Sequence, residues 1–83
     1  MKILYFAWLR TEIGKSSEDI SLPAGIQTVN DLLNWLPERG NNYAQALQKR
    51  DLLRIAINQD YADLDQKIHD SDEVAIFPPV TGG

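Results

Sequence analysis

The chain is 83 residues long, enough for one domain, and it contains no cysteine, so neither disulfides nor thiolate ligands can reinforce its core. Hydrophobic residues make up 43% and charged residues 24%, proportions that are typical of a folded globular protein. Eight basic against twelve acidic residues give a net charge of −4, the wrong sign for binding a nucleic-acid backbone. A chain this short also has little interior volume for a deep catalytic pocket.

The longest apolar stretch, Ile3 to Leu9, is far shorter than the ~20 residues that span a bilayer. Only Lys2 offers a positive charge before it, and no small-residue cleavage site follows, so we expect neither a membrane partner nor a signal peptide. The absence of cysteine fits a reducing compartment. We therefore expect a cytoplasmic protein.

Two strands are expected at the start of the chain. Residues 3–9 are rich in β-branched and aromatic side chains and are apolar at both parities, which is typical of a strand buried on both faces or facing a partner on one. Gly14 and the polar residues 15–17 predict a turn. Residues 18–22 predict a returning strand, which residues 23–25 end.

A helix is expected next, with Thr28 as its N-cap and Asp31 completing a capping box. Its apolar positions recur at i, i+3, i+4 and i+7 and share one face: Val29, Leu32, Leu33 and Leu36. Pro37 disfavours helical geometry at the preceding residue, so we expect the helix to end at Leu36. A second, shorter helix is predicted over residues 42–49. Its inward side chains are expected to be Tyr43, Ala46 and Leu47.

The last third of the chain is expected to form strands. Residues 53–57 and 73–77 predict two strands, and residues 61–64 predict a short edge strand between them. Residues 58–60 and 70–72 predict turns. One main helix laid across one face of a single mixed sheet is the α+β arrangement expected for so small a chain.

A short tail follows the last strand, which divides the chain into a domain over residues 1–77 and a tail over residues 78–83. The two prolines of the tail fix φ and favour an extended exit, and six extended residues reach ~20 Å. The two final glycines have no Cβ, so the backbone there fits a channel too narrow for any side chain. The tail residues are Pro78, Pro79, Val80, Thr81, Gly82 and Gly83, the last of which carries the reactive carboxylate.

The ending Phe-Pro-Pro-Val-Thr-Gly-Gly is more specific than a diglycine, which also occurs at frayed chain ends. Residues 72–83 closely resemble the C-terminus of the molybdopterin synthase sulfur carrier subunits, a family of ubiquitin-like sulfur carriers. The first strand followed by Arg10 and Gly14, the helix capped by Thr28, and residues 56–59 resemble the same family. The likeness therefore covers essentially the whole chain.

This resemblance implies a β-grasp (ubiquitin-like) fold and a defined cycle. In the family, an activating enzyme of the ubiquitin-activating type uses ATP to adenylate the terminal carboxylate, here that of Gly83. A sulfur donor protein then converts the adenylate to a thiocarboxylate. The tail enters the active site of the large, catalytic subunit of molybdopterin synthase, where the sulfur passes to cyclic pyranopterin monophosphate. The family also implies a heterotetramer with two small subunits on a large-subunit dimer.

The residues are consistent with a carrier that is not catalytic alone. The chain lacks a Gly-x-x-x-x-Gly-Lys phosphate loop, so we expect the activating partner to hold ATP and this chain to bind no cofactor of its own. A thiocarboxylate sulfur is nucleophilic at neutral pH. A protein without cysteine can therefore deliver sulfur from Gly83.

Strand parity predicts a docking patch at the base of the tail. We expect four residues of the first and last strands to face the helix: Ile3, Tyr5, Val74 and Ile76. Phe6, Trp8 and Phe77 then face the other side of the sheet, which no second helix covers. We hypothesise that Phe6, Tyr61 and Phe77 form the partner-binding patch. The alternatives are the opposite parity, or a loop near Asn41 folded over these side chains.

Other clusters point less clearly to a function. One histidine and four acidic residues gather near the turn before the last strand: Asp65, His69, Asp70, Asp72 and Glu73. Their spacing matches no metal-ligand pattern and is typical of a solvated turn, so we expect no metal site. A small basic group is more often a solvated face than a contact for an acidic partner: Lys49, Arg50 and Arg54.

Two other functions stay open from the residues alone. The first is sulfur carriage for thiamin synthesis or tRNA thiolation, whose carriers share the fold and the diglycine but usually lack this proline pair. The second is a ubiquitin-like interaction module with an inert tail.

Overall fold

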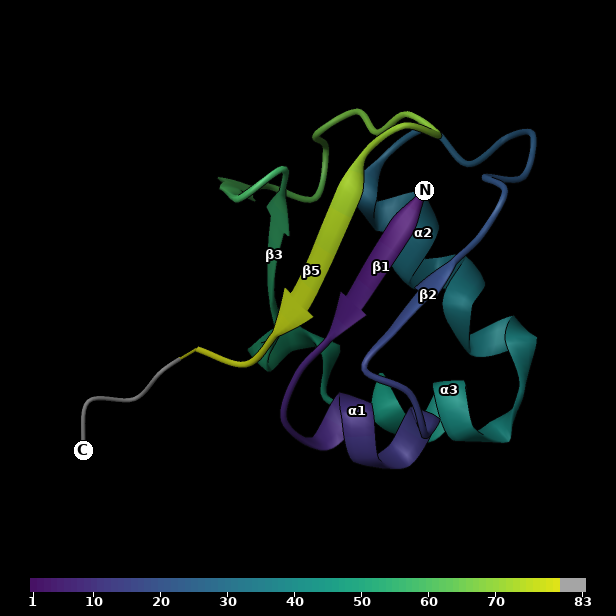
Figure 1. Cartoon of the computed structure of the whole chain (residues 1–83), viewed down its shortest axis with the longest axis vertical. Helices are drawn as coiled ribbons and strands as arrows, with labels where there is room; N and C mark the ends of the chain where they lie inside the picture. The colour runs from purple at the N-terminus through teal and green to yellow at the C-terminus, as the bar shows by residue number, and fades with distance from the viewer. Residues whose placement is uncertain (80–83) are drawn as a thin grey trace.

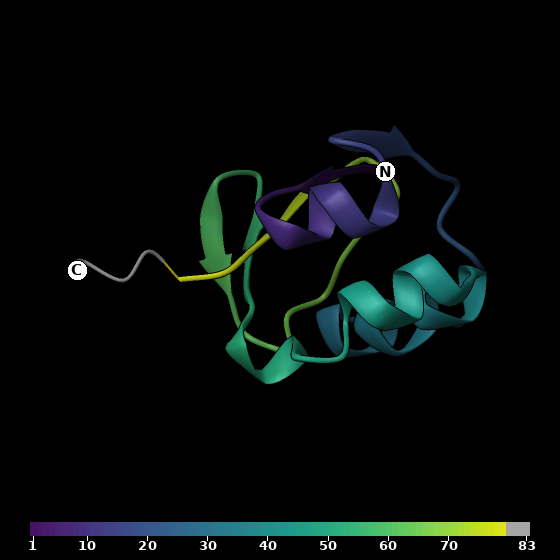
Figure 2. The same cartoon turned by 90° about the horizontal axis from the view of Figure 1, so that it is seen from below.

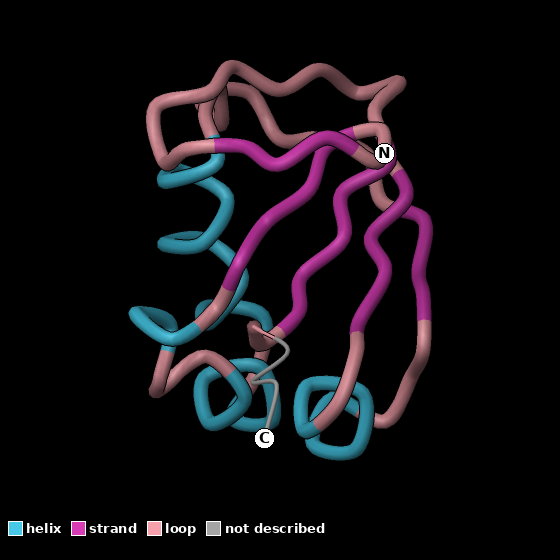
Figure 3. The backbone as a smooth tube through the Cα atoms, turned by 90° about the vertical axis from the view of Figure 1, so that its left-hand side faces the viewer, coloured by secondary structure: helices cyan, strands magenta, loops and turns pink. Residues whose placement is uncertain are grey.

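The computed structural model describes residues 1–79. Its elements in chain order are β1 (Lys2–Tyr5), α1 (Trp8–Ile13), β2 (Ser17–Asp19), α2 (Val29–Trp35), the 3₁₀ helix η1 (Leu36–Arg39), α3 (Asn41–Ala46), the 3₁₀ helix η2 (Arg50–Leu52), β3 (Arg54–Ile57), β4 (Asp60–Ala62) and β5 (Glu73–Phe77). The five strands form one sheet in the order β2-β1-β5-β3-β4 (Figures 1 and 3). Only the β1–β5 pair of this sheet is parallel, so the predicted mixed α+β sheet is confirmed.

The core lies between the sheet and the helices on one of its sides. Figure 2 shows α2 and α3 on that side of the strands. Ile3 of β1 and Val74 and Ile76 of β5 are fully buried beneath the helices, which confirms the predicted parity of these two strands. All seven side chains expected to point inward from the two predicted helices are buried: Val29, Leu32, Leu33, Leu36, Tyr43, Ala46 and Leu47.

The N-terminus of α2 has the predicted capping box. The Thr28 hydroxyl accepts a hydrogen bond from the Asp31 amide at 3.2 Å, and Asp31 Oδ2 accepts bonds from the amides of Gln27 and Thr28 at 3.0 and 3.2 Å. These donors lower the pKa of Asp31, the Gln27 amide most strongly. The α-helix ends at Trp35, next to the predicted Leu36. The predicted effect of Pro37 on the backbone is wrong, because Leu36 keeps helical angles (φ −53°, ψ −42°) and the chain continues into η1.

The first predicted strand is too long. β1 ends at Tyr5, and Ala7, with φ 55° and ψ −132°, turns the chain out of the sheet. Leu9 and Ile13 then lie four residues apart on the buried side of α1. An apolar run at both parities fits either a strand or a short buried helix, and here the turn at Ala7 decides between them. Gly14, in the left-handed region with φ 88°, ends α1.

The remaining elements lie where they were predicted, with shifted ends. β5 matches its predicted range, 73–77, and β4 is an edge strand as expected. β2 is shorter than predicted, although Ile20 after it still exchanges two backbone hydrogen bonds with Met1, each of 2.8 Å. The two 3₁₀ helices and α1 were not predicted. Each is a short element of three to six residues, and its local sequence pattern is correspondingly weak.

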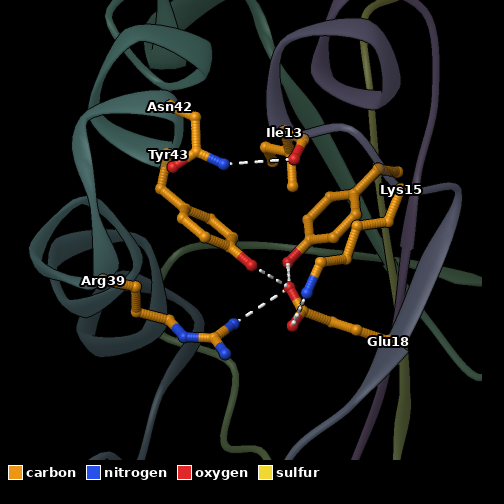
Figure 4. A network of polar contacts seen from close by, with 7 residues as sticks. Ile13, Lys15, Glu18, Arg39, Asn42 and Tyr43 are labelled. Atoms are coloured by element: carbon orange, nitrogen blue, oxygen red, sulfur yellow. Dashed lines mark hydrogen bonds and ion pairs between the residues drawn. The ribbon is translucent and has the colours of Figure 1, made fainter.

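One carboxylate joins four parts of the fold. Glu18 of β2 lies opposite Ile3 on the inward face, and its side chain is only 8% exposed. Its Oε2 accepts hydrogen bonds from the hydroxyls of Tyr5 and Tyr43 at 2.6 and 2.8 Å. Arg39 Nη1 lies 2.9 Å from the same oxygen (Figure 4). This cluster, the Glu18 network, ties β1, β2, η1 and α3 together.

The charge of Glu18 is favoured by these partners. Burial by itself raises the pKa of a carboxyl group, but the hydrogen bonds from Tyr5, Tyr43 and Arg39 outweigh it and lower the pKa of Glu18 to about 2. The same contact, together with burial, raises the pKa of Tyr5. The network therefore stabilises the fold only while Glu18 is ionised.

We expect Glu18→Gln to lower the free energy of unfolding at neutral pH by about 2–3 kcal/mol, since the amide keeps the shape but loses the charge. The wild-type contribution is fully present above the ordinary carboxyl pKa of 4.5 and is lost as the pH falls toward about 2. Urea unfolding across this pH range measures both effects. The matched control is Glu12→Gln on the exposed side of α1. Equal losses in the two variants would contradict the network's role.

Candidate functional site

The face of the sheet turned away from α2 carries two rows of side chains. In the first row, Ala56 of β3 pairs with Ala75 of β5 and with Tyr61 of β4. In the second row, Arg54 of β3 pairs with Phe77 of β5. Residues paired directly across a ladder lie on the same face, so the alanines leave a shallow strip beside the larger side chains of the second row.

Phe6, Tyr61 and Phe77 meet on this face and form what we name the aromatic patch. The ring centroids of Phe6 and Phe77 lie 6.4 Å apart in an edge-to-face arrangement, and those of Tyr61 and Phe77 lie 5.9 Å apart. Tyr61 is 80% exposed and Phe6 43% exposed, although large aromatic side chains usually pack inside. The structure thus brings together the three residues predicted from parity. Their binding of a partner stays a prediction.

Trp8 lies in a helix and not in the first strand, so its predicted place on the same face of the sheet as Phe6 is wrong. It is the first residue of α1 and is half-buried against the core. Its indole Nε1 donates a hydrogen bond to the carbonyl oxygen of Ala46 at 3.1 Å. Because the strand stops at Tyr5, the alternation that placed Trp8 beside Phe6 no longer applies.

A strained turn borders the patch. The amide of Leu9 donates to the carbonyl oxygen of Phe6 at 3.2 Å, and Ala7 takes the position where a type II′ turn favours glycine. With Phe6, Ala75, Phe77 and Pro78, Ala7 lines an apolar hollow of about 440 Å³. Strained residues gather at functional sites, so this turn is part of the candidate site. No local pattern in the sequence distinguishes Ala7 from a strand residue.

The tail begins beside the patch. Pro78 and Pro79 follow Phe77 outside any strand or helix, and this segment runs away from the body of the domain (Figure 1). The other predicted site residues of the tail lie outside the described residues: Val80, Thr81, Gly82 and Gly83. The division into residues 1–77 and 78–83 therefore stays a prediction.

Residues 1–79 contain neither a candidate metal site nor a candidate membrane-spanning helix. No group of three or more His, Cys, Asp or Glu side chains among them is arranged to hold a metal ion. None of the helices formed by these residues is long and apolar enough to cross a membrane.

A five-stranded mixed sheet crossed by one main helix, with an exposed patch where the last strand ends, defines a β-grasp domain of the ubiquitin-like class. The crystal structure of SAMP1 from Haloferax volcanii has the same fold: it covers 100% of this chain and 98% of its own, at 29% identity and a TM-score of 0.74. A chain of the complex of subunits 1 and 2 of molybdopterin-converting factor from Helicobacter pylori shares the fold at 21% identity and a TM-score of 0.65, covering 99% of this chain and 96% of its own.

Sequence comparison is more specific. The family model of the ThiS family matches residues 3–83. The molybdopterin synthase sulfur carrier subunit of Escherichia coli is 37% identical over 83 residues, which cover 100% of this chain and 99% of that protein. The molybdopterin synthase sulfur carrier subunit of Haemophilus influenzae is 39% identical over 83 residues, which also cover 100% of this chain and 99% of that protein. The chain therefore belongs to the ThiS family of ubiquitin-like sulfur carriers, in the group of the molybdopterin synthase sulfur carrier subunits.

We expect Ala7→Val to lower the free energy of unfolding by about 2 kcal/mol or more, because a β-branched side chain fits poorly at a positive φ. Ala7→Gly should keep or raise it, since glycine adopts this backbone conformation without strain. Both are measured by urea unfolding. Ala62→Val, at a half-buried position in β4, is the control, because valine favours strands. If Ala7→Val were as stable as Ala62→Val, the turn would not be strained.

Proposed function

We propose that this chain is the sulfur carrier of a molybdopterin synthase and that the Gly83 carboxyl group is the site to which the sulfur is attached. In the proposed cycle, Gly83 is adenylated, becomes a thiocarboxylate and gives its sulfur to cyclic pyranopterin monophosphate in the large subunit. The full-length similarity to molybdopterin synthase sulfur carrier subunits is the observation that carries this proposal.

The chemistry of each step follows from the groups involved. A free carboxylate reacts poorly with nucleophiles, because it would have to expel an oxide. Adenylation replaces that leaving group with AMP and releases pyrophosphate from ATP. A sulfide-level sulfur supplied by the donor can then attack the acyl carbon; the C–S bond forms, the C–O bond to AMP breaks, and a thiocarboxylate is left at Gly83. Since the chain has no cysteine, this sulfur would be its only sulfur nucleophile.

The shape of the tail suits delivery at a distance. Pro78 and Pro79 restrict φ where the chain leaves the sheet, which lowers the conformational entropy lost when the tail enters a channel. If all six residues after Phe77 were extended in the complex, they would reach ~20 Å. The Gly83 carboxyl group would therefore lie up to ~20 Å inside the surface of a partner bound at the aromatic patch.

The proposal divides the work between this chain and its partners. The large subunit would supply the active site for the pterin. An activating enzyme of the ubiquitin-activating type would bind ATP, and a separate sulfur donor protein would supply the sulfur. In the Helicobacter pylori complex, subunits 1 and 2 of molybdopterin-converting factor are bound to each other, which supports a large-subunit partner for this chain.

We expect incubation with activating enzyme, ATP and a sulfur donor to replace one oxygen of Gly83 with sulfur. Intact-mass spectrometry measures the change, and peptide mapping locates it. Alkylation by a thiol reagent should then modify the charged protein only, because the uncharged chain has no cysteine. A protein that gains no alkylatable sulfur under these conditions would refute the carrier function.

Two variants of the tail serve as controls for this experiment. Deleting Gly83, or adding a residue after it, should abolish charging and leave the free energy of unfolding unchanged, since the tail follows the last strand. Charging of the extended protein without trimming would show that the Gly83 carboxyl group is not the site.

We expect Phe77→Arg to weaken binding of the large subunit by at least about tenfold, because Phe77 is the ring that contacts both others in the patch. Titration calorimetry measures the dissociation constant, and circular dichroism checks the fold. Leu52→Arg is the matched control, since Leu52 is 54% exposed and lies outside the patch. Unchanged binding by Phe77→Arg would exclude the patch as the docking surface.

A further inference from the structure

Arg54 extends the aromatic patch with a positive charge. It is the first residue of β3 and pairs directly with Phe77 in the β3–β5 ladder, so both side chains lie on the face of the sheet that α2 does not cover. Directly paired side chains have Cβ atoms about 5 Å apart. Arg54 is an exposed residue, and because β3 and β1 lie on opposite sides of β5, it flanks Phe77 on the side away from Phe6.

Two of the other three arginines of the described chain are used by the fold, whereas Arg10, exposed on α1, lies away from Phe77 and forms no side-chain hydrogen bond or ion pair within residues 1–79. Arg39 binds the buried carboxylate of Glu18 at 2.9 Å. Arg50 donates from Nη1 to Asn34 at 2.6 Å and from Nη2 to Asn30 at 2.9 Å, which ties η2 to α2. These side chains are held by contacts inside the domain.

Arg54 has much weaker internal contacts. Its Nη1 donates to the carbonyl oxygen of the neighbouring Leu53 at 3.2 Å, and within residues 1–79 it forms no ion pair. Asp51 and Asp63 line the same surface hollow of about 430 Å³, but neither comes within ion-pair distance of the guanidinium. Most of the five N–H donors of this group therefore point to no acceptor among the described residues.

A guanidinium next to exposed aromatic rings has the composition of a binding surface. Arginine, tyrosine and phenylalanine are enriched at protein interfaces, and arginine is less strongly hydrated than lysine. Its planar fork matches a carboxylate with two parallel hydrogen bonds. Burying Arg54 under a partner without such an anion would leave a charge unpaired, at a considerable cost in binding free energy.

We propose that Arg54 is a specificity-determining residue of the docking surface and pairs with a carboxylate of the large subunit that covers the aromatic patch. This proposal rests on the proposed function. The apolar rings supply buried area, and the Arg54–carboxylate pair orients the partner at the edge where the tail leaves the sheet. A partner with an apolar or basic residue opposite Arg54 would bind more weakly, because the buried guanidinium would have no anion to pair with.

The test measures the dissociation constant of the complex with the large subunit at low and high ionic strength. Arg54→Glu should weaken binding at least about tenfold at low salt, because it sets two carboxylates against each other. The difference from wild type should shrink at high salt, where charges are screened. The dissociation constant of Arg54→Lys should lie between those of the wild type and Arg54→Glu, since lysine keeps the charge but cannot form the two parallel hydrogen bonds of a guanidinium.

Lys49→Glu is the matched control, because it makes the same change in net charge at an exposed position outside the docking face. Lys49→Glu should bind within about twofold of wild type. An equal loss in the two Glu variants would mean that only net charge acts, and it would overturn the proposal.

The result separates this proposal from the proposed function. If Arg54→Glu binds as wild type does while Phe77→Arg does not bind, Arg54 is a solvated residue and only the further inference is wrong. If the wild-type chain itself does not bind the large subunit, both proposals are wrong.

Discussion

The parallel pairing of β1 with β5 is the constraint on which the rest of the structure depends. It brings the first and the last strand of the domain together at the centre of the sheet, with Ile3 beside Val74 and Tyr5 beside Ile76. β2 is added beside β1, β3 beside β5, and β4 beside β3. Because β5 is central, the tail leaves from the middle of the sheet, and surfaces of several strands surround its base.

A domain of this size has helices for only one face of its sheet. α2 and α3 cover the face that carries the core, and the Glu18 network fixes η1 and α3 to β1 and β2 through one ionised carboxylate. The opposite face keeps its aromatic rings exposed around Phe77. The same shortage of chain that rules out a deep catalytic pocket thus leaves a surface for a partner, and it places the reactive group of the proposed cycle on a tail beyond the core.

Sequence reasoning succeeded where the governing rule is local. The capping box at Thr28, the inward face of α2 and the limits of β5 depend on residues a few positions apart, and all were predicted. It failed at residues 3–9, where one backbone angle at Ala7 turns an apparent strand into a helix. The partners of Glu18 were also missed, because Tyr5, Arg39 and Tyr43 come from three separate elements and no spacing connects them.

The sequence by itself determined the class of fold, the family and the residue at which the proposed chemistry occurs, since periodicity and a specific tail are properties of short segments. Strand parity also predicted three of the side chains at the base of that tail, but only the tertiary structure brought them into contact and placed Arg54 beside them. Phe6, Tyr61, Phe77 and Arg54 come from four parts of the chain, and they meet because strand order and register place them together. A shift of one residue in any of these ladders would turn the patch inward, so its existence depends on the register of the whole sheet.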